Sequence, residues 1–218
     1  LASNAFGVPI QFDKVHVEGI TQLDAADVAF AERLGYRVKL LGIAKRNPQG
    51  LELRVHPTLV SAKHLLAQVN GSMNAVMVKS DAAGVTMYYG AGAGSEQTAS
   101  AVIADLVDLA RSSSVVHRHR VPSLAFQHNT IVALPVSAME DVETAYYLRL
   151  DVARLSRTLP QVLAHLAYAG VRVRQLDVLD HPHDAELNAV VVQTEPTQLR
   201  LLRQALAAIE QLPTVMGF

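Results

Sequence analysis

The stretch YYGAGAGSEQTASAV, residues 88 to 102, joins a strand pattern to a helix pattern through alternating glycine and alanine. Glycine adopts positive φ angles easily and lets a ligand approach the backbone, because no Cβ stands in the way. The first turn of the helix that follows directs unpaired N–H groups and the positive end of the helix dipole toward the loop. We therefore expect this loop to suit a phosphate, a carboxylate or the polar edge of a cofactor ring.

Two nucleotide-binding patterns do not match this loop. A P-loop ends in Gly-Lys-Ser or Gly-Lys-Thr, and no such ending is present. A dinucleotide-binding fingerprint opens a first βαβ unit and is followed about twenty residues later by an acidic residue. Asp108 lies inside the predicted helix itself and does not meet this requirement. By spacing alone, the stretch is also consistent with a plain structural turn between a strand and a helix.

Hydrophobic patterning predicts a mixed α/β arrangement around the loop. Thr21, with Asp24 three residues later, is typical of a helix start, and Gly35 is typical of a helix end. In chain order, the predicted elements are a helix tail at 1–6, a helix from Thr21 to Gly35, a hairpin with strands at 37–44 and 51–56, a short helix at 61–68, paired strands at 74–79 and 85–89, and a helix at 98–111. The last of these helices carries Val102, Leu106 and Leu109 on one apolar stripe.

Composition excludes several classes of protein. The chain has 218 residues, of which 50% are hydrophobic, so it is long enough for one large domain or two small ones with a real core. Its net charge of -1 provides no basic face for nucleic acid. The absence of cysteine excludes disulfides and thiolate metal sites and fits the cytoplasm. No apolar run approaches the roughly twenty residues of a membrane helix, so we expect no membrane partner.

Histidine pairs are the remaining candidates for metal ligands. Ser112 to about Ser123 is predicted to be a linker, and His117-Arg118-His119-Arg120 within it is interpreted as a solvated charged segment. The two histidines share no helix face and have no carboxylate nearby, so we expect no metal site. We interpret His181-Pro182-His183 in the same way, as a solvated turn. His56 and His64 are expected on a strand face and a helix face.

The second half predicts a ferredoxin-like unit. Strands and helices alternate in the order βαββαβ, which places two helices on one face of an antiparallel sheet. The predicted elements are strands at 144–152, 171–179, 187–193 and 215–218, and helices at 158–168 and 197–212. Gly170 is expected to end the first of these helices. The fold class expected for the whole chain is therefore α/β (α+β), with a mixed-sheet portion followed by this unit.

Three stretches of the first half resemble the later part of the catalytic domain of homoserine dehydrogenases: VEGITQLDAADVAFAERLGYRVKLLGIAKR, HLLAQVNGSMNAVMV and YYGAGAGSEQTASAVIADL. The resemblance covers residues 1 to 111. In that family the glycine loop lies beside the nicotinamide end of the cofactor, which implies that Gly92, Ala93, Gly94 and Thr98 lie near NADP or NAD. Where the family often has Leu-Pro-Thr, this chain has Glu96-Gln97-Thr98, so the rigid proline at the helix start is missing.

Residues 144 to 218 resemble an ACT domain, the amino-acid-sensing module that follows the catalytic domain in many homoserine dehydrogenases. YYLRLDV and the junction at Gly170 carry this resemblance. The family's Asp-x-Pro-Gly-Val turn after the first strand normally helps to hold the effector. Here that turn is replaced by residues 153–161, ARLSRTLPQ, which predicts a weak response to threonine.

The resemblance implies a C-terminal fragment of homoserine dehydrogenase, because residue 1 is not methionine and the dinucleotide-binding domain is expected upstream. Residues 1–111 would be catalytic-domain, 112–143 a connection and 144–218 the ACT domain. The family interconverts L-homoserine and L-aspartate 4-semialdehyde on the way to threonine and methionine. We predict no catalytic residue in this chain, and interpret the four lysines of the first half as solvated: Lys39, Lys45, Lys63 and Lys79.

The sequence is also consistent with two other classes of protein. The chain could be a non-catalytic amino-acid-binding regulator whose first half is a scaffold. It could also be a dimerisation module, since pairing of sheet edges would produce a homo-oligomer without any ligand. A glycine loop in front of a helix argues against the first of these alternatives.

Overall fold

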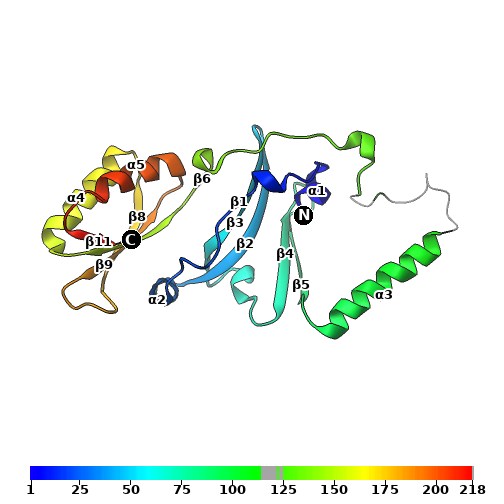
Figure 1. The fold of residues 1–218 in the computed structure, drawn as a ribbon, viewed down its shortest axis with the longest axis horizontal. Coiled ribbons are helices and arrows are strands. Elements are labelled where there is room, and N and C mark those ends of the chain that lie inside the picture. The colour runs from blue at the N-terminus through cyan, green and yellow to red at the C-terminus, as the bar shows by residue number, and fades with distance from the viewer. Residues whose placement is uncertain (114–121, 123–124, 218) are drawn as a thin grey trace. The chain divides into compact units, whose positions relative to one another are not determined.

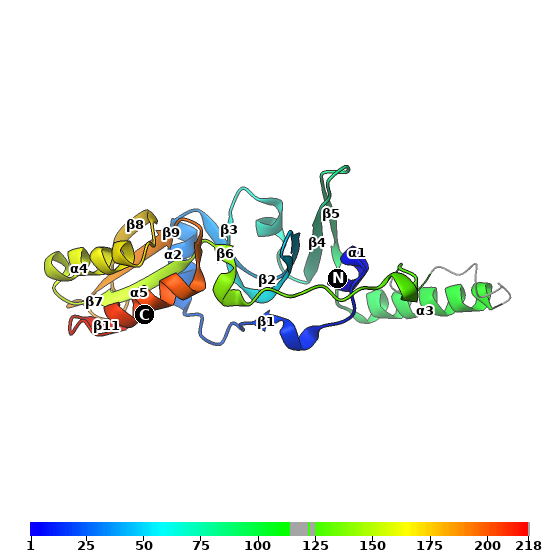
Figure 2. The ribbon, with the colours of Figure 1, turned by 90° about the horizontal axis from the view of Figure 1, so that it is seen from above.

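The computed structural model describes residues 1–113, 122 and 125–217, and the chain divides into two compact units. The first is made of residues 1–10, 31–40 and 57–133, and the second of residues 11–30, 41–56 and 134–218. Figure 1 and Figure 2 show the elements in chain order from blue to red. Most of the predicted linker, including His117 to Arg120, lies outside the described residues, as does Phe218.

The predicted helix tail is confirmed as α1 (Ala2–Phe6). Gly7 follows it in the left-handed conformation, at φ 65°, and its N–H donates to the carbonyl oxygen of Ser3 at 3.0 Å. A left-handed glycine commonly ends a helix in this way. Short 3-10 turns connect other parts of the chain: η1 (Phe12–Lys14), η4 (His128–Thr130) and η5 (Met139–Asp141).

The predicted hairpin is confirmed, and its strands are longer than the sequence pattern indicates. β2 (Tyr36–Asn47) and β3 (Gly50–Ser61) are neighbours in a three-stranded sheet of order β1-β3-β2. The short β1 (His16–Val17) runs parallel to β3. β3 continues through Pro57, beyond the last residue of β3 that pairs with β1.

The short helix predicted at 61–68 is confirmed only for its second half, and its predicted start is wrong. β3 runs to Ser61, and only a 3-10 turn, η2 (Leu65–Gln68), follows it. His64 Nδ1 accepts a hydrogen bond from the N–H of Leu66 at 3.2 Å. This histidine therefore caps the turn instead of lying on a helix face.

Helix α2 (Ala25–Arg33) begins after Asp24, later than the predicted cap at Thr21. The Asp24 carboxylate accepts from the N–H of Ala26 at 3.0 Å, and the Asp27 carboxylate accepts from the N–H of Asp24 at 3.3 Å. This reciprocal pair is a capping arrangement of the predicted kind at a different position. The spacing Thr21-x-x-Asp24 is repeated by Asp24-x-x-Asp27, and the sequence pattern alone could not distinguish between them.

The strands and the helix on either side of the glycine loop are confirmed. β4 (Met73–Lys79) pairs antiparallel with β5 (Val85–Ala91), and Val76 lies opposite Tyr88. α3 (Ser95–Ser112) starts earlier than predicted, directly after Gly94. The loop therefore consists of the few residues between the end of β5 and the start of α3.

The ferredoxin-like unit is confirmed in residues 143–217, and we call it the module. Its sheet has the order β11-β7-β9-β8, with β9 antiparallel to both β7 and β8. Its elements are β6 (Glu143–Thr144), β7 (Tyr147–Val152), α4 (Leu155–Tyr168), β8 (Val173–Asp180), β9 (Asn188–Thr194), β10 (Thr197–Gln198), α5 (Leu199–Ile209) and β11 (Val215–Gly217). Gly170, at φ 78°, follows α4 as predicted.

Both faces of the module's sheet are buried. Helices α4 and α5 cover one face, and the core between them contains Leu150, Val152, Val162, Leu166, Val190, Val192, Leu202, Ala205 and Ile209. On the opposite face, Ala189 and Val191 of the central strand β9 are also buried. The start of α2 lies beside that face in both ribbon views (Figures 1 and 2).

Candidate functional site

The glycine loop lies at the amino-terminal end of α3. β5 ends at Ala91, and Gly94 is the N-cap residue of α3 at φ 133° and ψ 151°. The N–H of Thr98 donates to the carbonyl oxygen of Gly94 at 3.1 Å, which is the first hydrogen bond of the helix. An N-terminal helix turn directs N–H groups outward, so the loop presents donors to whatever lies over it.

A side chain at either of two predicted site residues would require a neighbouring side chain to move. A Cβ on Gly92 would lie 1.9 Å from Nδ2 of Asn74, and a Cβ on Gly94 would lie 2.1 Å from Oε1 of Gln97. The φ angle of Gly94 is in addition one that other residues rarely adopt. In contrast, a Cβ on Gly90 would meet no atom within 4 Å. The loop therefore has two constrained glycines and one unconstrained glycine.

Only two of the four predicted cofactor-binding residues line the same depression in the structure. Gly94 and Thr98 line an open depression along α3, together with Ser95, Ala99, Val102 and Ile103. Gly92 and Ala93 immediately precede this depression, between β5 and Gly94. All four predicted residues are exposed.

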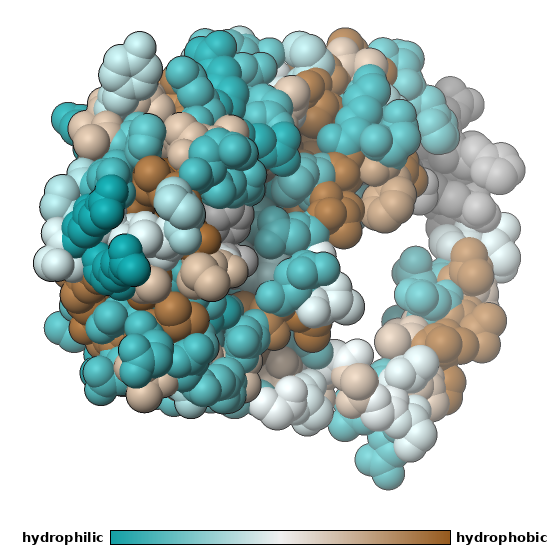
Figure 3. Space-filling model, turned by 60° about the vertical axis from the view of Figure 1, so that its left-hand side comes forward, coloured by the Kyte–Doolittle hydropathy of each residue, from teal (hydrophilic) through white to brown (hydrophobic). Residues whose placement is uncertain are grey.

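The depression continues into an apolar stripe on α3. Val102, Ile103, Leu106, Val107 and Leu109 are 41 to 63% exposed, although side chains of this kind are normally buried on one face of a helix. Figure 3 shows apolar side chains gathered on the arm that α3 forms. Among the described helices, none is long and apolar enough to cross a membrane.

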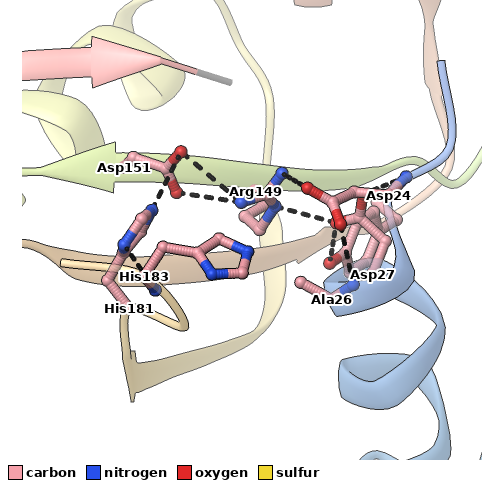
Figure 4. A network of polar contacts seen from close by, with 8 residues as sticks. Asp24, Ala26, Asp27, Arg149, Asp151, His181 and His183 are labelled. Carbon is pink, nitrogen blue, oxygen red and sulfur yellow. Dashed lines mark hydrogen bonds and ion pairs between the residues drawn. The ribbon is translucent and has the colours of Figure 1, made fainter.

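A network of polar side chains, not predicted from the sequence, joins α2 to the module. Nε of Arg149 and the hydroxyl of Tyr147 both donate to Oδ1 of Asp27, each at 2.9 Å. Nη2 of Arg149 lies 3.5 Å from Oδ2 of Asp24, and Nη1 lies 3.2 Å from Oδ1 of Asp151. Figure 4 shows the guanidinium of Arg149 between these carboxylates. We call these five residues the Arg149 network.

Contacts within the network shift the pKa values of Asp24, Tyr147 and Arg149. The N–H of Ala26 is the largest cause that holds the pKa of Asp24 below its ordinary value of 3.8, and the charge of Arg149 acts in the same direction. Burial and the nearby Asp27 carboxylate raise the pKa of Tyr147 above 10.0. Burial opposes the charged form of Arg149, but the carboxylates of Asp27 and Asp151 outweigh it and raise the pKa of Arg149. At neutral pH, Asp24 is therefore ionised, Arg149 charged and Tyr147 neutral.

The interpretation of His181 as a solvated residue is wrong. Its side chain is 12% exposed, and its Nε2 lies 3.6 Å from Oδ2 of Asp151. The N–H of His183 donates to Nδ1 of His181 at 3.3 Å, and the His183 side chain lies at the exposed side of the turn. In the part of the chain that the structure describes, no group of three or more His, Cys, Asp or Glu residues is arranged to hold a metal ion. His181 is thus a neighbour of the Arg149 network.

Comparison with known proteins relates this geometry to one family. Residues 1–107 match the family model described as homoserine dehydrogenase. The chain is 46% identical to the homoserine dehydrogenase of Pseudomonas aeruginosa over 217 residues, covering 100% of this chain and 50% of that protein. It is 43% identical to the homoserine dehydrogenase of Neisseria gonorrhoeae, covering 99% of this chain and 49% of that one. A crystal structure of a homoserine dehydrogenase from Thiobacillus denitrificans has a TM-score of 0.89 at 47% identity, covering 99% of this chain and 48% of the other.

The fold and the glycine loop define an α/β protein in which a mixed-sheet part precedes a ferredoxin-like module. This chain belongs to the homoserine dehydrogenase family. It spans about half the length of the curated relatives that it matches.

Proposed function

We propose that this chain is part of an NAD(P)-dependent homoserine dehydrogenase, which interconverts L-homoserine and L-aspartate 4-semialdehyde in threonine and methionine biosynthesis. The observation that carries the proposal is the similarity to homoserine dehydrogenases across the length of the chain. Within it, residues 1–111 are proposed to be the later part of the catalytic domain, residues 112–143 a connecting segment and residues 144–218 an ACT domain.

Gly92, Ala93, Gly94 and Thr98 are proposed to lie beside NADP or NAD. The two constrained glycines fit this role, because side chains there would change the loop and the start of α3. When bound, the cofactor supplies or accepts the hydride. Glu96 in the first turn of α3 already places a negative charge at the helix end. This charge disfavours a phosphate at the loop and favours an uncharged, hydrogen-bonding part of the cofactor.

Replacing Gly94 by Val in the whole enzyme is expected to weaken NADPH binding by about tenfold or more. The reason is that a side chain at φ 133° costs about 1–3 kcal/mol of strain, which the loop relieves by leaving the conformation proposed to bind the cofactor. Fluorescence titration with NADPH, alongside calorimetric unfolding, measures affinity and stability separately. The matched control is Gly90→Ala, because its Cβ enters open space. Unchanged affinity in Gly94→Val, together with a large loss of stability, would mean that the loop is a structural turn.

The module is proposed to respond weakly to threonine. Several polar groups in and beside the turn between β7 and α4 are already bonded within the chain. The buried hydroxyl of Thr158 donates to the carbonyl of Ala153 at 2.7 Å, and the N–H of Ala153 donates to the carbonyl of Thr214 at 2.8 Å. An amino-acid ligand at this turn would have to displace these bonds.

Titration calorimetry of L-threonine into the 218-residue chain is therefore expected to show no saturable binding in the micromolar range. D-Threonine serves as the control for heats of dilution and nonspecific association. Micromolar L-threonine binding with one site per chain, absent for D-threonine, contradicts the proposal.

We also propose a homo-oligomer formed through a sheet edge of the module. β8 lies at one edge of the sheet, and an unpaired edge strand favours association with another strand. The proposed compartment is the cytoplasm, which fits a chain without cysteine.

A further inference from the structure

The first turn of α2 is attached to the module by side chains that are largely removed from water. The side chains of Arg149 and Asp27 are each 14% exposed, and that of Asp151 is 17% exposed. Hydrogen bonds to charged groups contribute more to stability than neutral ones, and a buried charge that loses its partner is costly. Removing Arg149 would therefore leave the largely buried carboxylates of Asp27 and Asp151 without their counter-charge, which is costly.

Arg149 is the residue that balances the negative charges of the network. Asp24, Asp27 and Asp151 bring three carboxylates to the same place, and Arg149 forms an ion pair with each of them. His181 contacts Asp151, and it is charged only when protonated. Without Arg149, α2 would present two carboxylates to a sheet face that carries a third. Repulsion would then add to the loss of the hydrogen bonds.

Helix α2 is too short to be stable by itself. It has nine residues, whereas isolated helices of fewer than about 12–15 residues are marginal in water. Its burial is uneven: Phe30 and Ala31 are buried, but Val28 is exposed. The helix therefore relies on its cap and on tertiary contacts, and its cap residues Asp24 and Asp27 are the same residues that Arg149 binds.

We propose that Arg149 is a positioning residue that makes the folding of α2 conditional on its attachment to the module. The coupling is reciprocal, so an ordered α2 also stabilises the sheet face that it covers. This inference does not depend on the proposed enzymatic function.

The test is hydrogen–deuterium exchange, read by mass spectrometry, on the 218-residue chain and its Arg149→Met variant. Methionine keeps an unbranched apolar side chain like the stem of arginine and removes the charged guanidinium. The amides of residues 28–33 are expected to exchange about tenfold faster or more, while those of β9 in the module core change far less. The matched control is Arg37→Met, because Arg37 of β2 forms an exposed ion pair at 3.7 Å with Glu32 of α2.

A milder variant keeps the test decisive if Arg149→Met fails to fold. Tyr147→Phe removes only the hydroxyl that donates to Asp27, and it is expected to accelerate exchange in α2 by a few-fold. Its control is Tyr168→Phe on the exposed surface of α4. Unchanged exchange in α2 in both variants overturns the proposal. An equal acceleration in α2 and in β9 also overturns it, because Arg149 would then stabilise the whole fold without a specific link to α2.

Discussion

The purified 218-residue chain is expected to oxidise L-homoserine at a rate several orders of magnitude below that of a complete homoserine dehydrogenase. Hydride transfer requires that cofactor and substrate are held in contact, with a proton-transfer group in place, and loss of such positioning removes a large part of the rate enhancement. The chain spans about half the length of its relatives, and the glycine loop and the stripe on α3 are exposed. Nothing in the described part of the chain encloses a ligand at the loop.

The measurement is NADP reduction at high L-homoserine concentration, with the Pseudomonas aeruginosa homoserine dehydrogenase as the positive control. Turnover by the purified chain, beyond that of a mock purification, would contradict the expectation. Lys39 would then be the first residue to replace. The structure gives Lys39 another role, and the interpretation of it as a solvated lysine is wrong: its Nζ donates to the carbonyl of Val69 at 2.5 Å and to Oδ1 of Asn70 at 3.0 Å.

Replacing Glu52 by Gln is expected to destabilise the chain by about 3–5 kcal/mol, because it leaves a buried guanidinium without its counter-charge. Arg54 on β3 is 4% exposed, and its Nη2 lies 3.8 Å from Oε2 of Glu52. An arginine cannot escape the cost of burial by losing its proton. Glutamine retains an oxygen for the hydrogen bond from Asn47 and replaces the oxygen that faces Arg54 by an uncharged NH2 group, so the attraction to the guanidinium is lost.

Chemical denaturation of the chain and its variants measures this loss. The control is Glu32→Gln, which breaks an exposed ion pair with Arg37 and is expected to cost less than about 1 kcal/mol. The double variant Glu52→Gln/Arg54→Met is expected to recover much of the stability, since it removes both charges. Equal losses of unfolding free energy in Glu52→Gln and Glu32→Gln would contradict the prediction. They would show that the burial of Arg54 does not increase the cost of removing its counter-charge.

Local patterns were sufficient where short-range physics decides the structure. The α/β order, the hairpin turn at 48–49, the pairing of β4 with β5 and the βαββαβ module follow from alternation, helical periodicity and the positions of glycine. The position of the glycine loop between a strand and a helix also followed from these signals. The same signals could not say that Gly92 and Gly94 are sterically constrained while Gly90 is free, since this depends on Asn74 and Gln97.

Tertiary structure decided everything that depends on residues distant in the chain. Two overlapping spacings allowed α2 to start at Thr21 or at Asp24, and the attachment of Asp27 to Arg149 and Tyr147 accompanies the second choice. His181 looked solvated because its partner Asp151 lies on another strand of the sheet. The sequence by itself therefore determined the elements, their order and the candidate loop, because these are set by local periodicity and backbone preference. Only the tertiary structure determined the partners in the Arg149 network, which come from distant parts of the chain, and the burial of the Arg54–Glu52 pair on β3. Long-range packing removes these charges from water.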